Sequence, residues 1–380
     1  MNPNKESKTK EFNKAFHNLK SKEIRKITRL LKKQIYPLID LKMHHNSKYS
    51  EDDFLDLLTY VAMNHDFTNN GSKTFELLRE NTPASNTVIY HIKKLNPEYV
   101  KNLFMETSNV LIKLASKHKS LKKRVDLAID ITEQMYYGNK NDYMVCETKP
   151  KNGTSHCFRY ITINIVEKGK RFTLLALPMH QFDEKTDLIE KLVNYARKKV
   201  KIRYLYLDRG FDRIDVINKL KELKIKFIMP KKRNPVVKAY ILKTEGKYSH
   251  VVNNFVMGRK NRDQAVFNLI LVVGKTGDKV CFATNVDFPE PLAHRLLRLY
   301  GKRWGIETSY RVKGDFKPRT TSKYYSVRLF YFMWSVCLYN LWVLVSFLVA
   351  LIFCLDLKKP LVTAKLFGTI LYSMEPQRIT

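Results

Sequence analysis

The sequence predicts a protein of the α/β class, in which an all-α region precedes a sheet. Three observations support this. Residues 1–123 carry helical periodicity, residues 125–229 alternate apolar strands with amphipathic helices in the order β-β-β-α-β-α-β, and residues 232–288 hold further strand-like runs before a helix over 289–315. With 380 residues, of which 44% are hydrophobic, the chain is long enough to bury a sizeable core, which excludes a disordered or collagen-like protein.

The charge of the chain indicates a polyanionic partner. It has 69 Lys and Arg residues against 36 Asp and Glu residues, a formal net charge of +33. The excess is found in both the first 125 residues and the remainder, so it is not a basic tail. A compact fold with this excess repels itself unless a polyanion neutralises it, and nucleic acid or an anionic membrane surface would do so. The alternative is a Lys-rich surface without a specific partner.

The N-terminal region is predicted to consist of helices. Helical periodicity runs over 23–41, acidic residues from Glu51 begin another helix, and a helix-turn-helix candidate lies near 74–95. Ser85 is predicted to cap its second helix. The side chains predicted to face a DNA groove are Asn86, Thr87, Tyr90, His91 and Lys94. The alternative is a helical hairpin with a structural role only.

The α/β region begins at Val125, where helical periodicity is followed by a strand-like alternating run. The predicted strands are 125–132, 156–166, 171–179, 202–208 and 226–229, the predicted helices are 183–200 and 213–223, and later strand-like runs cover 250–257, 265–273 and 279–284. In open α/β sheets, ligands bind at the carboxyl ends of the strands. We therefore expect the chemistry at that edge.

Three acidic residues stand at positions suited to metal chemistry. Asp130 lies near the end of the first strand between two isoleucines, Asp208 ends the fourth strand, and Glu307 lies in the late helix. Converging carboxylates in a basic protein are a common way to hold Mg²⁺ over a phosphate. Taken singly, each has a structural alternative, as a turn former, a helix cap or a solvated helix face.

The late helix places three further groups together. Tyr300, Arg303 and Glu307 are spaced by three and four residues and share one face of a helix. A carboxylate for a metal with an arginine for phosphate is the composition of a phosphodiester site. Gly301 and Gly305 each weaken the helix by about 1 kcal/mol and permit close approach of a sheet or a DNA backbone.

These motifs resemble the DDE transposases of bacterial and archaeal insertion sequences, in the group marked by a Tyr-x2-Arg-x3-Glu-x6-Lys signature. The resemblance rests on Asp-Ile-Thr…Tyr-Tyr-Gly from Asp130, Leu-Asp-Arg-Gly-Phe around Asp208, and the Tyr300, Arg303 and Glu307 spacing. It implies an RNase H-like mixed sheet with helices and a β-rich insertion. The implied domains are a helical DNA-binding region at 1–120, a catalytic core at 121–231 and 289–356, the insertion at 232–288 and a helical tail at 357–380.

The resemblance also implies an activity. Asp130, Asp208 and Glu307 would hold two divalent cations, Mg²⁺ or Mn²⁺, for cleavage and strand transfer at the ends of an insertion sequence, and Tyr300 and Arg303 would position phosphates. The implied partner is double-stranded DNA, as the terminal repeats and the target, bound by a dimer. The alternative is a catalytically inactive, transposase-derived DNA-binding protein.

The signature lysine is displaced in this chain. Position 314 is Gly, and Lys313 comes one residue early. On a continuous helix Lys313 lies about 120° from the face of Glu307, whereas Arg311 lies about 40° from it. Either the helix ends before Lys313 and frees it to reach phosphate, or Arg311 takes that role.

An uncharged run over 329–355 is long enough to cross a membrane. The alternatives are a membrane-anchored basic protein and a helix buried in the core. The resemblance favours the buried helix, because such transposases carry a very hydrophobic helix after the glutamate, so no stable membrane partner is expected. Five cysteines without a C-x-x-C pair and an N-terminus without a secretory signal predict a cytoplasmic, nucleoid-associated protein.

Overall fold

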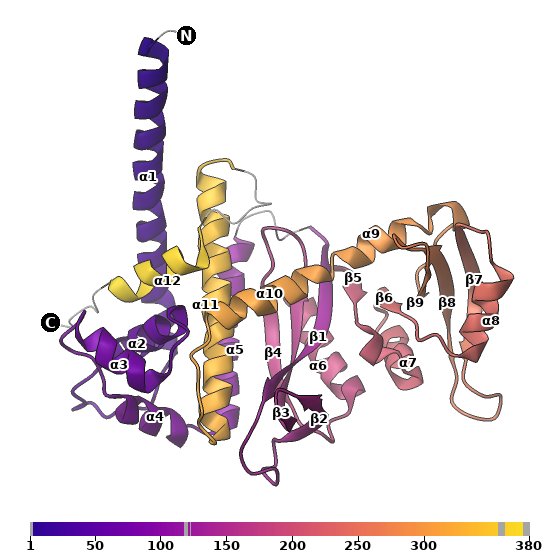
Figure 1. The fold of residues 1–380 in the computed structure, drawn as a ribbon, viewed down its shortest axis with the longest axis horizontal. Coiled ribbons are helices and arrows are strands. Elements are labelled where there is room, and N and C mark those ends of the chain that lie inside the picture. The colour runs from indigo at the N-terminus through magenta and orange to yellow at the C-terminus, as the bar shows by residue number, and fades with distance from the viewer. Residues whose placement is uncertain (1–2, 118–120, 122, 356–361, 375–380) are drawn as a thin grey trace. The chain divides into compact units, whose positions relative to one another are not determined.

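The computed structural model describes residues 3–117, 121, 123–355 and 362–374, and the chain forms two compact units (Figure 1). Unit 1 comprises Met1–Leu111, Lys168–Lys170 and Arg311–Thr380, and unit 2 comprises Ile112–Glu167 and Arg171–Tyr310. Unit 1 is helical and unit 2 carries the sheet. Parts of the tail predicted at 357–380 lie outside the described residues.

Unit 1 is built around one long apolar helix, α11. Its Trp334 is fully buried and meets the ring of Tyr36 edge-on, at 5.8 Å between centroids. Among the described helices only α11 is long and apolar enough to cross a membrane, and 72% of that stretch is buried inside the structure. The helices of this unit are α1 (Pro3–Ile35), η1 (Tyr36–Leu38), α2 (Glu51–Met63), α3 (Thr68–Glu76), α4 (Ser85–Lys94), most of α5 (Pro97–Ser116), α11 (Tyr325–Ile352) and α12 (Ala364–Ser373).

The helix-turn-helix candidate near 74–95 covers the end of α3 and all of α4, because α3 begins earlier than predicted, at Thr68. Val88 and Ile92 are fully buried, so α4 packs its apolar face inward as its spacing requires. The prediction that Ser85 caps α4 is wrong. The N-cap is Ala84, which offers no side-chain acceptor, and the Ser85 hydroxyl lies 3.3 Å from Asn69 Oδ1.

Unit 2 contains a nine-stranded mixed sheet in the order β2-β3-β1-β5-β6-β9-β8-β7, with β4 also paired to β3. The mixed α/β architecture predicted from the sequence is confirmed, although the short strand β2 was not predicted. The strands are β1 (Val125–Met135), β2 (Cys146–Lys151), β3 (Thr154–Ile165), β4 (Thr173–Met179), β5 (Ile202–Tyr206), β6 (Phe227–Pro230), β7 (Ser249–Met257), β8 (Ala265–Val273) and β9 (Lys279–Thr284).

Strand direction changes along this sheet. The central strands β1, β5 and β6 are parallel, whereas β3 is antiparallel to β1 and β9 is antiparallel to β6. Because β9 pairs with β6, the strands of residues 232–288 extend the same sheet. The helices of the unit are α6 (Lys185–Arg197), α7 (Ile214–Glu222), α8 (Pro235–Lys243), α9 (Arg295–Gly301) and the first part of α10 (Trp304–Asp315), with the short η3 (Arg209–Phe211) and η4 (Glu290–Leu292).

The late helix is not continuous, which corrects the prediction of one helix over 289–315. It breaks into α9 and α10 at Lys302 and Arg303. There the backbone N–H groups donate to the carbonyl three residues earlier, as in a 3₁₀-helix, and not to the carbonyl four residues earlier. Gly305, the second residue of α10, lies against the sheet region. A Cβ there would come within 2.9 Å of Arg171 Nε and 3.3 Å of the Val166 carbonyl, so the close approach expected of a glycine is made to the sheet region.

A buried carboxylate joins the sheet to the α9–α10 junction. Asp126, at the start of β1, is fully buried and accepts hydrogen bonds from Arg203 at 2.7 and 2.8 Å, Lys302 Nζ at 2.6 Å and the Tyr206 hydroxyl at 3.2 Å. Burial raises the pKa of Asp126, but the hydrogen bonds and charges of Arg203 and Lys302 outweigh it and hold this pKa below its usual value.

We expect Asp126→Asn to lower the free energy of unfolding at pH 7 by about 2–3 kcal/mol. Breaking a fully buried ion pair costs about 3–5 kcal/mol. The loss expected here is smaller, because Arg203 and Lys302 remain partly exposed. Since the folded pKa is depressed, the carboxylate stabilises the protein above the unfolded pKa, and the difference between variant and wild type should shrink as pH falls below about 4. Urea titrations at several pH values measure it.

Glu190→Gln is the matched control, because it breaks a more exposed pair with Lys219. It should cost less than about 1 kcal/mol. Equal losses in the two variants would contradict the role given to Asp126.

Candidate active site

The sheet register brings Asp130 and Asp208 to the same level. Ala128 of β1 lies opposite Tyr206 of β5 in a parallel pair, and each acidic residue follows two positions later. The Asp208 carboxylate accepts the Gly210 backbone N–H at 2.8 Å, which fixes the turn into η3. The Asp130 carboxylate accepts the backbone N–H of Ile131 at 3.0 Å. Both therefore lie just past the last parallel pair of β1 with β5. Asp208 follows the end of β5 as predicted, whereas β1 continues to Met135, so Asp130 lies within its strand and the prediction that it stands near the strand end is wrong.

Arg303 links the third acidic residue to this pair. Its guanidinium lies 3.8 Å from Asp130 Oδ2 and donates a hydrogen bond to Glu307 on α10. Arg303 and Asp130 side chains are each 14% exposed, whereas Glu307 is 38% exposed. Arg303 Nε is buried without a partner in the described part of the chain, so this guanidinium retains an unused donor.

Asp208 and Glu307 both act electrostatically on Asp130. Burial first, and then the negative charges of Asp208 and Glu307, raise the pKa of Asp130 to about 6, against the opposing effects of Arg303 and the Ile131 hydrogen bond. A site in which one carboxylate is destabilised by two others favours a cation between them.

Two tyrosines, Tyr310 and Tyr300, hydrogen-bond to the backbone beside the acidic residues. The sequence did not predict this role. The Tyr310 hydroxyl donates to the Asp130 carbonyl at 3.2 Å and lies 2.5 Å from Thr162 Oγ1, so it ties α10 to β1 and β3. The Tyr300 hydroxyl donates to the carbonyl of Leu207 at 3.2 Å. Tyr310 follows Glu307 by three residues, a spacing that places it on the same side of α10.

The donor set fits a divalent cation in its chemistry. Carboxylate oxygens are the ligands that Mg²⁺ and Mn²⁺ prefer. Among the described residues, however, no three acidic, histidine or cysteine side chains are close enough together to hold a metal. In this structure the positive charge at the site is the guanidinium of Arg303, which lies by Asp130 and Glu307.

The other predicted site residues belong to unit 1. The expectation that the helix ends before Lys313 is wrong, because α10 continues to Asp315. Lys313 is only 3% exposed, and its Nζ lies 5.1 Å from the centroid of the Tyr339 ring. Arg311 is exposed on the same helix. On α4, the side chains of Asn86, Tyr90 and Lys94 form an exposed row.

We expect Asp208→Asn and Glu307→Gln each to lower the pKa of Asp130, because each removes a negative charge that raises it. Carboxyl-carbon NMR titration of Asp130 measures this. Asn at position 208 retains the oxygen that accepts the Gly210 N–H, so the variant should fold with unchanged or higher stability at pH 7. The control is Asp187→Asn, an exposed change on α6. An Asp130 pKa that is the same in all variants would contradict the coupling.

Comparisons with known proteins bear on the fold and the family. Residues 178–341 match the family model described as a transposase DDE domain, a range that includes Asp208 and Glu307 but not Asp130. A solved structure, the piggyBac transposase synaptic complex with hairpin DNA, matches with a TM-score of 0.59 and 11% identity, over 92% of this chain and 77% of that one. No curated protein matches the sequence.

At 11% identity the structural likeness establishes the fold alone, a mixed sheet with helices that this chain shares with that structure. The family model supports the resemblance to DDE transposases over residues 178–341, the part of the chain that it matches.

Proposed function

We propose that this chain is a DNA transposase that cleaves and joins phosphodiesters at the ends of a prokaryotic insertion sequence. The observation that carries the proposal is the electrostatic effect of Asp208 and Glu307 on Asp130, at the level where β5 ends beside β1. When bound there, divalent cations would activate the attacking oxygen and stabilise the leaving oxygen. Mg²⁺ or Mn²⁺ would serve.

The chain's own residues would hold the site and the DNA. Asp130 and Asp208 would supply ligands from neighbouring strands, and Glu307 would supply the third from α10. Arg303 offers a planar set of donors, including the unpartnered Nε, that suits a phosphate oxygen. Arg303 now contacts the carboxylates of Asp130 and Glu307. Binding of cations to these carboxylates would free its guanidinium for a DNA phosphate. Tyr300 would act by fixing the Asp208 loop through Leu207.

The proposed partner is double-stranded DNA. The net charge of +33 favours it, and so does the fold shared with the piggyBac transposase, whose solved complex contains hairpin DNA. The exposed row on α4, Asn86, Tyr90 and Lys94, would read the terminal repeats, and Arg311 is better placed than the buried Lys313 to contact phosphate. We propose a dimer on the DNA, because two ends must be brought together.

The test is cleavage of duplex DNA carrying the sequences that flank the reading frame, with Mg²⁺ or Mn²⁺. Wild type should nick at the element boundary only with metal. Asp208→Asn and Glu307→Gln should lower the rate by at least about 10³-fold, because each removes a ligand charge while keeping its shape. Binding of the same DNA should be retained, since neither change removes a positive charge.

Asp187→Asn should cleave like wild type and serves as the charge-matched control. DNA binding without cleavage in any of these proteins would instead support the alternative, an inactive DNA-binding protein derived from a transposase.

A further inference from the structure

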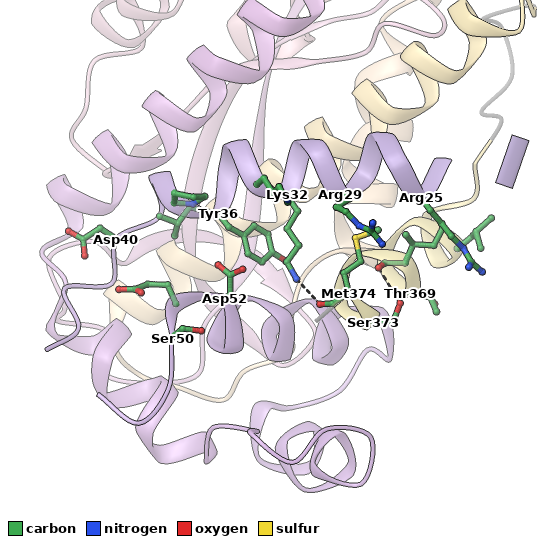
Figure 2. Close-up of a pocket in the computed structure, with 16 residues that line it drawn as sticks. Arg25, Arg29, Lys32, Tyr36, Asp40, Ser50, Asp52, Thr369, Ser373 and Met374 are labelled. Carbon is green, nitrogen blue, oxygen red and sulfur yellow. Dashed lines mark hydrogen bonds between the residues drawn. The ribbon is translucent and has the colours of Figure 1, made fainter. Parts of the chain in front are cut away.

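Unit 1 contains a cavity of about 1060 Å³ between α1, η1, the first turn of α2 and α12. Figure 2 shows that its lining is divided by charge. On one side of Lys32 lie Arg25 and Arg29, with hydroxyl side chains of α12 near them, and on the other side lie carboxylates near the start of α2. The two ends therefore attract ligands of opposite charge.

The positive end is a row on one face of α1. Arg25, Arg29 and Lys33 follow at intervals of four residues, so neighbours are separated by about 6 Å along the helix axis. All three are exposed, and none pairs with a carboxylate among the residues that the structure describes. Lys32 differs from them, because it is buried and its Nζ lies 2.7 Å from Asp56. The row is therefore positive charge that the described fold does not neutralise.

A second row, of hydroxyls, faces it from α12. Thr369 and Ser373 line the cavity one helical turn apart, and both are exposed. The two helices are held together at this point, because Lys32 Nζ donates to the carbonyl of Met374 at 3.1 Å. The cation row and the hydroxyl row thus form two walls of one preformed site.

The opposite end is acidic for structural reasons. Asp52 stands in the first turn of α2, where a negative charge stabilises the helix dipole. Asp40 accepts the Tyr99 hydroxyl at 3.0 Å and the Lys42 backbone N–H at 2.6 Å. These carboxylates repel an anion, which restricts its binding to the α12 end.

We propose that the α12 end of this cavity binds the phosphodiester backbone of DNA, with Arg25 and Arg29 on phosphates and the Thr369 hydroxyl as a further donor. Guanidinium groups bind phosphate through paired N–H donors, and hydroxyls are common partners of backbone oxygens. The inference rests on the proposed function. It assigns α12 to DNA binding, and the contact supplies affinity and register without reading sequence, in contrast to the role proposed for α4.

Fluorescence anisotropy of the full chain on a labelled duplex of about 30 base pairs, without metal and between about 50 and 200 mM KCl, tests it. Each lost phosphate contact lowers the slope of log affinity against log salt by about 0.9. We therefore expect Arg25→Gln/Arg29→Gln to reduce the slope by about 2 and to weaken binding about 10- to 100-fold at low salt. Both residues are exposed, so the variant should melt like wild type by circular dichroism.

Lys22→Gln/Lys26→Gln is the matched control. It removes the same charge from exposed positions of α1 that do not line the cavity, and its slope should stay within about 0.5 of wild type. Thr369→Val keeps shape and charge, so it should weaken binding about threefold with the slope unchanged.

Equal slope losses in the two double variants would overturn the proposal, because general positive charge would then explain binding. An unchanged slope in Arg25→Gln/Arg29→Gln, or an unchanged affinity in Thr369→Val, would overturn it as well. If wild type still binds the duplex in those cases, only the phosphate site at α12 is ruled out and the proposed function stands. Failure of the wild-type chain to bind any duplex would count against both.

Discussion

The ion-pair network around the buried carboxylate of Asp126 is the interaction on which unit 2 depends. A fully buried charge is costly, and this one is accommodated because Arg203, Lys302 and Tyr206 converge on it from different elements. The contact with Lys302 fixes the junction from which α10 starts, and α10 carries Glu307. One ion-pair network at the beginning of β1 thus sets the position of the third acidic residue, although Asp126 itself lies outside the site.

At the candidate site, carboxylates that repel one another lie beside one positive group, the guanidinium of Arg303. Asp130 is held among apolar neighbours near two other carboxylates, which raises its pKa to about 6, and Arg303 offsets part of that repulsion. An arrangement of this kind sacrifices stability for function. In the proposed function, the excess of positive charge elsewhere in the chain would attract DNA, and the row of Arg25, Arg29 and Lys33 in unit 1 is one place where this charge is not paired with a carboxylate among the described residues.

The sequence predicted the strands well, because alternating and continuous apolar runs bounded by polar turns are strong local signals. It also predicted that Asp130, Asp208 and Glu307 act together; in the structure Asp208 and Glu307 both raise the pKa of Asp130, and their role as ligands stays a prediction. It did not predict the break at Lys302, whose ammonium contacts Asp126 far away in the chain, nor the burial of Lys313 beside Tyr339. Long-range pairing of this kind leaves no periodic trace, and the hydroxyl contacts of Tyr310 with β1 and β3 were missed for the same reason.

In the proposed function the three carboxylates together form a cation site in the DNA-bound protein. Electron paramagnetic resonance of Mn²⁺, titrated into the full chain with duplex DNA, tests this most directly. Wild type should bind Mn²⁺ more tightly than the DNA alone does, and Asp208→Asn and Glu307→Gln should lose this binding while Asp187→Asn keeps it. Equal Mn²⁺ binding in all four proteins would show that the carboxylates do not form a cation site.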